Sequence, residues 1–303
     1  MKTVFIFPGL NGLIKLEDRF RYIQLPEVQQ RLHQVEQIFK IQNNEDISFE
    51  KYLQGSVQEI YSVENISKAA TAICALQVGA AENLMHNKGI KPDWTLGCSL
   101  GDLARAVISD VCSFEFMISG YIRFAHKLKG VETIGANIGV SKPKGAIFTE
   151  DEIATMGQLG LDVSVMTPKF LNIGGRYSDL EKLQETAKEK RWRVVKILDY
   201  PAHSRYIKDY VAAAAEEVKD VQLNLPLYRT FSSITCRELT KTDDLKQELM
   251  LNMTQPLRWG EAIKTLEQQL QNVKFINIGP CKSLTKMIPD LDLISPVYEI
   301  EDL

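Results

Sequence analysis

The chain has 303 residues, of which 45% are hydrophobic and 25% are charged. This length can bury a sizeable core in one large domain or two smaller ones, and the composition is typical of a globular protein. The formal net charge of −3 provides no overall basic footprint for nucleic acid. No apolar run is long enough to span a membrane, and the N-terminal run is too short for a signal peptide.

The cysteines and histidines argue against a metal centre. The five cysteines are scattered, odd in number and free of C-x-x-C spacing. This usage favours a reduced, cytoplasmic protein over a disulfide framework or a zinc site. The four histidines form no metal-ligand pattern either, so we expect no bound metal.

The N-terminal third predicts a strand and a long helix. Residues 3–7, TVFIF, form an apolar β-rich run that stops at Pro8 and Gly9. Residues 67–89 are rich in alanine and apolar on most sides, which predicts a buried helix. We expect Ser67 to cap this helix and Gly89 to end it.

Residues 92–105, PDWTLGCSLGDLAR, place Ser99 between two glycines. The pattern predicts a short strand that ends at Ser99, a tight turn and then a helix. That arrangement is the context of a nucleophile elbow, in which a sharp turn exposes a serine hydroxyl. The N-terminus of the following helix offers unpaired N–H groups to a developing negative charge.

Residues 131–199 have a pattern of their own. We expect strands at 145–149, 162–166, 170–175 and 192–198, with helices at 150–160 and 178–191. The order βαββαβ is that of a small ferredoxin-like unit. Inserted between residues 1–130 and 200–303, it predicts a two-lobed α/β molecule with a ligand cleft between the lobes.

The α/β alternation resumes after residue 200. A helix is expected over 204–221, capped by Ser204, and an amphipathic helix over 258–271. Strands are expected at 227–235 and 273–280, the second running into a loop. The alternation predicts a parallel sheet in the larger part of the chain.

A nucleophilic serine needs a general base, for which histidine is the usual residue because its pKa lies near neutral pH. His33 and His86 lie in polar, helix-like stretches, and His126 lies on a helix face. His203 instead follows a predicted buried strand and precedes a predicted helix. It is therefore the candidate base, although a loop histidine without chemistry remains the alternative.

Five motifs, in order along the chain, resemble those of the malonyl-CoA:acyl-carrier-protein transacylases and the related acyltransferases of polyketide synthases. They are FPGLNG (7–12), GCSLGD (97–102), DYPAHSRYI (199–207), NMTQPLRW (252–259) and NIGPCKSLTKM (277–287). The resemblance covers the whole chain and implies a hydrolase-like α/β lobe interrupted by a ferredoxin-like lobe. It also implies catalysis without a bound cofactor, on CoA or phosphopantetheine thioesters, with an acyl carrier protein as partner.

Carried over residue by residue, the resemblance implies that Ser99 is the nucleophile and His203 its base. Asn252 would accept a hydrogen bond from the other histidine nitrogen through a carbonyl oxygen, which fixes the tautomer. The backbone N–H groups of Leu10 and Leu100 would form the oxyanion hole. Arg123 aligns with the arginine that binds the free carboxylate of a malonyl group, a role suited to its planar fork.

Three departures leave the acyl group open. Cys98 replaces the family's histidine before the serine, which frees space beside the acyl group unless the position only packs. Leu10 stands at the usual glutamine. The stretch containing Tyr200 and Ala202 matches neither the malonyl nor the methylmalonyl loop, so we include both among the substrate-binding candidates. Malonyl or a C2-substituted malonyl unit is expected, carried by CoA or by a donor carrier protein.

Three other functions compete with acyl transfer. An acyl hydrolase would release acyl groups from carrier proteins, but such relatives tend to lack the arginine that Arg123 supplies. An ordinary serine esterase would place its histidine nearer the C-terminus than His203 lies. A non-catalytic carrier-binding protein is the alternative outside the enzymes, because several of the motifs are degenerate.

Overall fold

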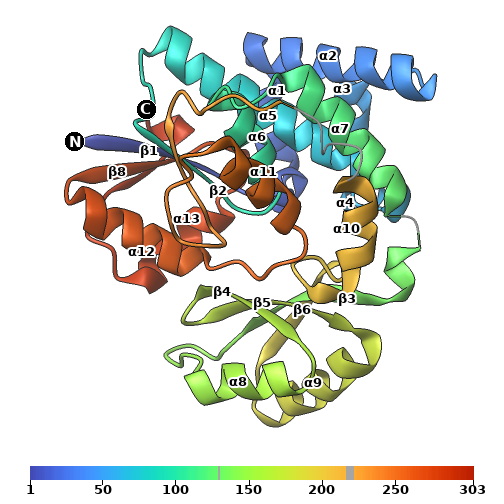
Figure 1. Ribbon diagram of the computed structural model, residues 1–303, viewed down its shortest axis with the longest axis vertical. Helices are drawn as coiled ribbons and strands as arrows, with labels where there is room; N and C mark the ends of the chain where they lie inside the picture. The colour runs from blue at the N-terminus through green and yellow to red at the C-terminus, as the bar shows by residue number, and fades with distance from the viewer. Residues whose placement is uncertain (129, 216–221) are drawn as a thin grey trace.

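The computed structural model describes residues 1–128, 130–215 and 222–303 and has two lobes (Figure 1). Strands of the large lobe form a parallel sheet in the order β7-β2-β1-β8-β9. They are β1 (Lys2–Phe7), β2 (Trp94–Gly97), β7 (Arg229–Phe231), β8 (Val273–Asn277) and β9 (Val297–Glu299). The expected α/β class with a parallel sheet is therefore confirmed.

Helices cover both faces of this sheet (Figure 1). Their apolar sides form two large cores, one beneath α2, α5, α6 and α7 and the other beneath α12 and α13, with smaller apolar clusters at α10 and α11. The helices of the large lobe are α1 (Leu16–Ile23), α2 (Pro26–Asn43), α3 (Phe49–Tyr52), α4 (Val57–Ile60), α5 (Ile66–Asn87), α6 (Gly101–Ile108), α7 (Phe114–Lys127), α10 (Lys208–Ala215), α11 (Thr242–Leu251), α12 (Trp259–Leu270) and α13 (Ser283–Met287).

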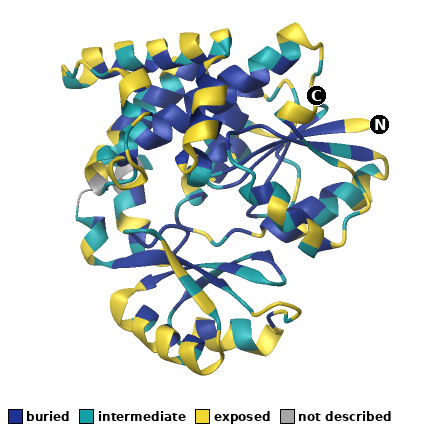
Figure 2. Cartoon of the chain, turned by 180° about the vertical axis from the view of Figure 1, so that it is seen from behind, coloured by how far each residue is buried: buried dark blue, intermediate teal, exposed yellow. Residues whose placement is uncertain are grey.

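Short 3-10 turns link several of these elements: η1 (Leu10–Leu13), η2 (Val63–Asn65), η3 (Val131–Thr133), η4 (Arg205–Ile207), η6 (Ile288–Leu291) and η7 (Ile300–Asp302). Figure 2 shows the buried residues concentrated in the central strands and the helices beside them. The long helix α5 is buried along most of its length, as its alanine-rich sequence predicted.

The small lobe is an antiparallel sheet in the order β4-β5-β3-β6. Its elements are β3 (Gly135–Ser141), α8 (Glu150–Gln158), β4 (Asp162–Thr167), β5 (Phe170–Arg176), α9 (Tyr177–Glu189) and β6 (Arg193–Leu198). Figure 1 shows α8 and α9 on the face turned away from the large lobe. This order and the βαββαβ succession are those of a ferredoxin-like unit.

Two local predictions were wrong, one within the small lobe and one just after it. Residues 145–149 form a loop, and the first strand of the small lobe lies earlier, at β3. Gly145 has a left-handed φ of 86°, which is incompatible with a strand. Ser204 occupies the N-cap position of η4, the turn that leads into α10, but its side chain makes no capping hydrogen bond and instead donates to the carbonyl of Pro201 at 2.5 Å. Residues 216–221 of the expected helix lie outside the described residues.

The ends of α5 differ in how well they were predicted. The helix begins at Ile66, so Ser67 lies in its first turn and is not the cap. Gly89 has a φ of 64°, and the N–H of Ile90 donates to the carbonyl of Leu84 at 3.1 Å. This is the glycine-terminated helix end that the sequence predicted.

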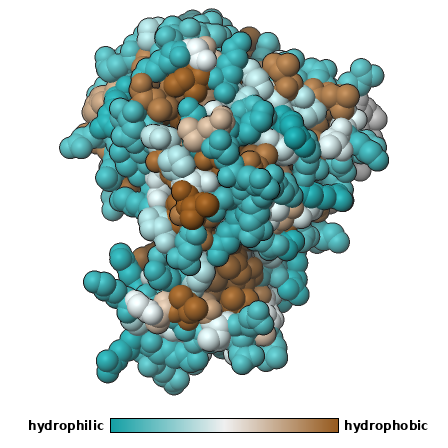
Figure 3. Space-filling model, turned by 90° about the vertical axis from the view of Figure 1, so that its left-hand side faces the viewer, coloured by the Kyte–Doolittle hydropathy of each residue, from teal (hydrophilic) through white to brown (hydrophobic). Residues whose placement is uncertain are grey.

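Contacts between the lobes place β4 and β5 against the large lobe. The backbone N–H of Leu257 donates to the hydroxyl of Ser164 at 2.8 Å, and Lys169 forms an ion pair with Asp290 at 2.5 Å. Figure 3 shows the molecule narrowing between the lobes, with apolar residues gathered at the narrowing. The chain passes from β6 back to the large lobe through residues 199–204, which carry His203.

Candidate active site

Ser99 lies in the tight turn between β2 and α6. Its φ is 56°, a left-handed conformation that is uncommon for a residue with a side chain. The next glycine allows the turn to pack closely, because a Cβ on Gly101 would lie 2.0 Å from the carbonyl oxygen of Phe7. The elbow predicted from the spacing is thus the observed local structure.

His203 lies in the chain that leaves the small lobe after β6. It is 3% exposed, and its φ of 58° is also left-handed. The backbone N–H of His203 donates to the backbone carbonyl of Met253 at 2.7 Å. The side-chain amide of Asn137, on β3, donates to the carbonyl of Ala202 at 2.9 Å. Groups from both lobes therefore hold residues 199–204, the histidine loop.

The structure brings Ser99, His203 and Asn252 together. The Ser99 Oγ lies 2.8 Å from Nε2 of His203, and Nδ1 lies 2.6 Å from the backbone carbonyl oxygen of Asn252. A carbonyl oxygen only accepts hydrogen bonds, so Nδ1 carries the proton. Nε2 then presents a lone pair to the Ser99 hydroxyl, which is the geometry of a general base and its nucleophile.

Burial sets the protonation state of this imidazole. Removal from water lowers the pKa of His203 to about 4, while the hydrogen bond to the Asn252 carbonyl acts in the opposite direction. The ring is therefore neutral at neutral pH and able to accept a proton.

Asn252 also connects the two halves of the site through its side chain. Its amide Nδ2 donates to the backbone carbonyl of Ser99 at 3.0 Å and to the carboxylate of Asp102. The residue ends α11 as its C-cap and is 6% exposed. One residue therefore orients the histidine through its backbone and contacts the elbow through its side chain.

A buried charged cluster, which the sequence analysis missed, lies behind Asn252. It consists of Asp102 and Arg105 on α6 and Glu248 on α11, each no more than 2% exposed. The Nε of Arg105 donates to Asp102 at 2.6 Å, and the Ser232 hydroxyl donates to Glu248 at 2.7 Å. Burial and the neighbouring Asp102 raise the pKa of Glu248 to about 7, opposed by Arg105.

Two backbone N–H groups border the nucleophile. Leu100 follows Ser99 at the start of α6, and Leu10 opens the turn after β1. Within the described part of the chain, no hydrogen bond uses either N–H group. The Tyr61 hydroxyl donates to the carbonyl of Leu10, and Gln77 donates to the carbonyl of Pro8 at 2.6 Å. These bonds hold the turn in place beside the elbow.

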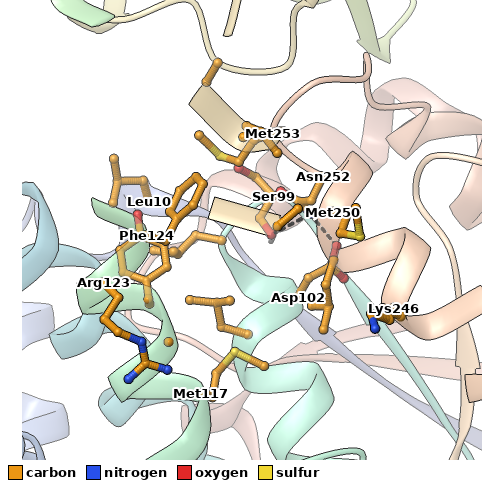
Figure 4. A pocket seen from close by; sticks show the side chains of 18 of the residues that line it. Leu10, Ser99, Asp102, Met117, Arg123, Phe124, Lys246, Met250, Asn252 and Met253 are labelled. Carbon is orange, nitrogen blue, oxygen red and sulfur yellow. Dashed lines mark hydrogen bonds between the residues drawn. The ribbon is translucent and has the colours of Figure 1, made fainter. Parts of the chain in front are cut away.

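A pocket opens at the Ser99 hydroxyl (Figure 4). Leu10, Leu100 and Arg123, the candidates that the resemblance gave, line it. Tyr200 and Ala202, which were included where the sequence departs from the family, line it as well. Cys98 does not line it and packs instead with Val4, Ile6 and other apolar residues of the sheet core. Burial raises the pKa of the Cys98 thiol. Its placement gives no support to a substrate contact.

Arg123 lies on the wall formed by α7, next to Phe124. Its side chain is exposed, and Figure 4 shows the guanidinium turned away from the Ser99 hydroxyl. Phe124 and Met117, on the same helix, line the pocket with apolar atoms. Lys246, on α11, is a second cation of the lining that the sequence analysis did not identify.

The comparisons with known proteins identify the family and the fold. The model of the acyl transferase domain family matches residues 25–290. The chain belongs to the acyl transferase domain family. It is 24% identical over 301 residues to the malonyl CoA-acyl carrier protein transacylase of Bacillus subtilis, covering 95% of this chain and 89% of that protein. It is 28% identical over 211 residues to the polyketide biosynthesis acyltransferase homolog PksD of the same organism, covering 69% of this chain and 63% of PksD.

A solved structure shows the same fold. The malonyl-CoA:ACP transacylase of Synechocystis sp. PCC 6803 superposes with a TM-score of 0.81 at 18% identity, covering 100% of both chains. As a member of the acyl transferase family, the chain is an acyltransferase, and such enzymes act on CoA and carrier-protein thioesters without a cofactor. Within the described residues, no group of three or more His, Cys, Asp or Glu side chains is placed to hold a metal ion. No helix among the described residues is long and apolar enough to cross a membrane.

Proposed function

We propose that the chain transfers an acyl group from a thioester to the phosphopantetheine thiol of an acyl carrier protein through an ester on Ser99. The observation that carries this proposal is the continuous contact from Ser99 through His203 to the carbonyl of Asn252. The transacylase activity and the carrier-protein acceptor are those named for the Bacillus subtilis relative. Catalysis needs only groups that the chain itself supplies.

In the first half-reaction the Ser99 Oγ attacks the thioester carbonyl carbon while its proton passes to Nε2 of His203. The backbone N–H groups of Leu10 and Leu100 donate to the oxyanion that forms. The C–S bond then breaks, and the departing thiolate takes the proton from His203. In the second half the carrier thiol gives its proton to His203 and attacks the ester, and Ser99 regains the proton.

The acyl group of this proposal is malonyl or malonyl with a small C2 substituent, supplied by CoA or by a donor carrier protein. Tyr200 and Ala202 would border it, and Arg123 would bind its free carboxylate. The guanidinium reaches that position only after the exposed side chain turns toward Ser99, because it points away in the structure.

We further propose two properties of the whole chain. Residues 131–199 form an inserted lobe between 1–130 and 200–303, which the two separate sheets support. A cytoplasmic location is supported by the five scattered cysteines, all of which are free thiols.

The deciding experiment mixes the protein with malonyl-CoA and a holo acyl carrier protein and measures both malonyl-carrier and free malonate. We expect malonyl-carrier, and none above background with Ser99→Ala. Release of malonate without malonyl-carrier would instead establish an acyl hydrolase, the second candidate function. Neither product with any acyl donor would contradict both.

A further inference from the structure

Three helices present apolar faces to the pocket at Ser99. They are α7, α10 and α11, which approach the site from different directions (Figure 1). On α7 and on α10, lining residues recur four positions apart and therefore share one face of each helix. The lining residues on these helices that bear on the argument are Phe116, Gly120 and Phe124 on α7, Val211 and Ala215 on α10, and Leu249 on α11.

Apolar helix faces in a folded protein normally pack against one another. Here they surround the pocket that begins at the Ser99 hydroxyl, and its apolar interior is called the hollow below (Figure 4). Among the described residues, no atom lies within 4 Å of a Cβ built on Gly120, so this part of the α7 wall is open. Because Phe116 and Phe124 both line the hollow, it runs along about 12 Å of α7, the rise of eight helical residues.

Most of the wall near Ser99 is apolar, although Arg123 and Lys246 also line the pocket. Of two adjacent residues on α7, Phe124 lines the pocket as a half-buried ring, while the exposed Arg123 is turned away from Ser99. Asp102 also lines the pocket, but it is 1% exposed and both its oxygens accept hydrogen bonds. The inner wall thus offers an apolar environment to a chain of methylenes.

We propose that this hollow binds an uncharged acyl chain longer than malonyl, so that the enzyme accepts such thioesters in addition to malonyl. The inference rests on the proposed function, because the chain must be joined to Ser99 to lie in the hollow. Its occupant is the acyl group itself, since the apolar faces are continuous with the nucleophile that carries it. The bond changes are those of the Ser99 ester, with the donor thiol as leaving group.

The test measures the rate at which Ser99 is acylated by acetyl-, malonyl-, hexanoyl- and octanoyl-CoA, using intact mass after rapid quenching. Each methylene buried in the hollow is expected to raise the second-order rate constant by about fourfold, until the hollow is filled. Octanoyl-CoA should therefore exceed acetyl-CoA by at least tenfold. An octanoyl rate below the acetyl rate would overturn the proposal.

Filling the hollow provides the second part of the test. Gly120→Leu places a side chain into the open part of the wall, so it should slow octanoylation at least tenfold and leave acetylation nearly unchanged. Gly157→Leu is the matched control, because Gly157 lies on α8 of the small lobe and also has nothing within 4 Å of its Cβ. This control should behave like the wild type.

A second variant and the pattern of donors accepted distinguish failure of this inference from failure of the proposed function. If Gly120→Leu folds poorly, Leu249→Phe on the facing helix serves in its place, and the same selective loss of octanoylation is expected. Equal loss with all donors in a folded variant would overturn the acyl-chain site. Malonylation without any octanoylation would also overturn it while leaving the proposed function intact, whereas no adduct with any donor would overturn both.

Discussion

At the scale of single residues, the site depends on two strained positions. Ser99 and His203 both have left-handed φ values, at 56° and 58°. Such conformations cost roughly 1 to 3 kcal/mol each and persist where surrounding structure holds them. The close packing of Gly101 holds the first. The backbone hydrogen bond from His203 to Met253 and the side-chain hydrogen bond from Asn137 to Ala202 hold the second.

The pH dependence of Ser99 acylation follows from the burial of His203. Because burial lowers the pKa of this imidazole to about 4, the ring stays neutral and basic throughout the range above pH 5. We expect the acylation rate constant to be nearly flat from pH 6 to 8 and to fall as the pH is lowered through 4. Quenched-flow measurement of the acyl adduct provides the profile, and a half-maximal rate near pH 6.5 would show that the buried pKa shift is absent.

Replacement of Arg123 separates carboxylate binding from general catalysis. If Arg123 binds the free carboxylate, Arg123→Ala should slow malonyl transfer about 100-fold or more and spare acetyl transfer. Lys246→Ala, at the other cation of the pocket lining, is the comparison that shows whether any nearby positive charge suffices. Equal loss for acetyl and malonyl donors with Arg123→Ala would mean that Arg123 has a structural role.

Sequence reasoning identified the residues that we propose to react better than the side chains that support them. Ser99 and His203 could be recognised in the sequence because glycines, proline and predicted strand ends mark their loops. The buried Arg105 was not, because arginine on a helix is usually a solvated residue and nothing local indicates burial. The direction of the Arg123 side chain also depends on the packing of α7, which no local pattern specifies.

At the scale of elements, α6 and α11 meet through the charged cluster of Asp102, Arg105 and Glu248. Arg105 Nη1 and Glu248 Oε1 are both buried without a hydrogen-bond partner within the described structure. The cluster therefore combines one cation with two acids in a water-poor space. Its energetic cost depends on whether Glu248 carries a proton.

Replacing Glu248 by Gln should change how stability depends on pH. Burial and Asp102 raise the pKa of Glu248 to about 7, whereas an unfolded glutamate titrates near 4.3. Between these values the unfolded chain releases a proton that the folded chain keeps, so the free energy of unfolding falls as the pH rises. Glu248→Gln removes this pH dependence. The free energy of unfolding of the variant, relative to that of the wild type, should therefore rise by on the order of 1 to 3 kcal/mol from pH 5 to pH 8.

Urea unfolding at both pH values measures this difference. Glu185→Gln, at an exposed position on α9, is the control that should follow the wild type. A Glu248→Gln difference that stays constant from pH 5 to 8 would mean that Glu248 is ionised across the whole range.

The predicted elements failed mainly where glycine weakens the strand signal. The stretch GANIGVS forms β3, although glycine and asparagine are poor strand residues. Gly139 is tolerated there because the Phe170 ring of the neighbouring strand occupies the space of its missing side chain. This long-range contact is invisible in the local pattern, which instead favoured residues 145–149.

At the scale of the whole molecule, the small lobe helps to hold His203, the general base that we propose, in place. On β4, Asp162 is 7% exposed and accepts hydrogen bonds from the backbone N–H of Arg205 at 2.7 Å and from its Nε at 3.0 Å. Arg205 lies two residues after His203. The two lobes thus act as one unit around the histidine loop.

Loss of this anchor should slow chemistry more than binding. Asp162→Ala frees the Arg205 backbone, and the resulting displacement of His203 should lower the acylation rate constant by tenfold to a hundredfold, with a smaller effect on the apparent KM. Asp162→Asn keeps an acceptor and should recover part of the rate. Asp151→Ala, at an exposed position on α8, is the control. A fully active Asp162→Ala would show that the small lobe does not position the base.

The most direct measurement is the site of acylation after brief exposure of the protein to acyl-CoA, located by peptide mass spectrometry. We predict one ester on the peptide that contains Ser99, absent in Ser99→Ala and formed far more slowly in His203→Ala. An adduct of the same yield in Ser99→Ala, or one attached to another residue of the wild type, would contradict the account.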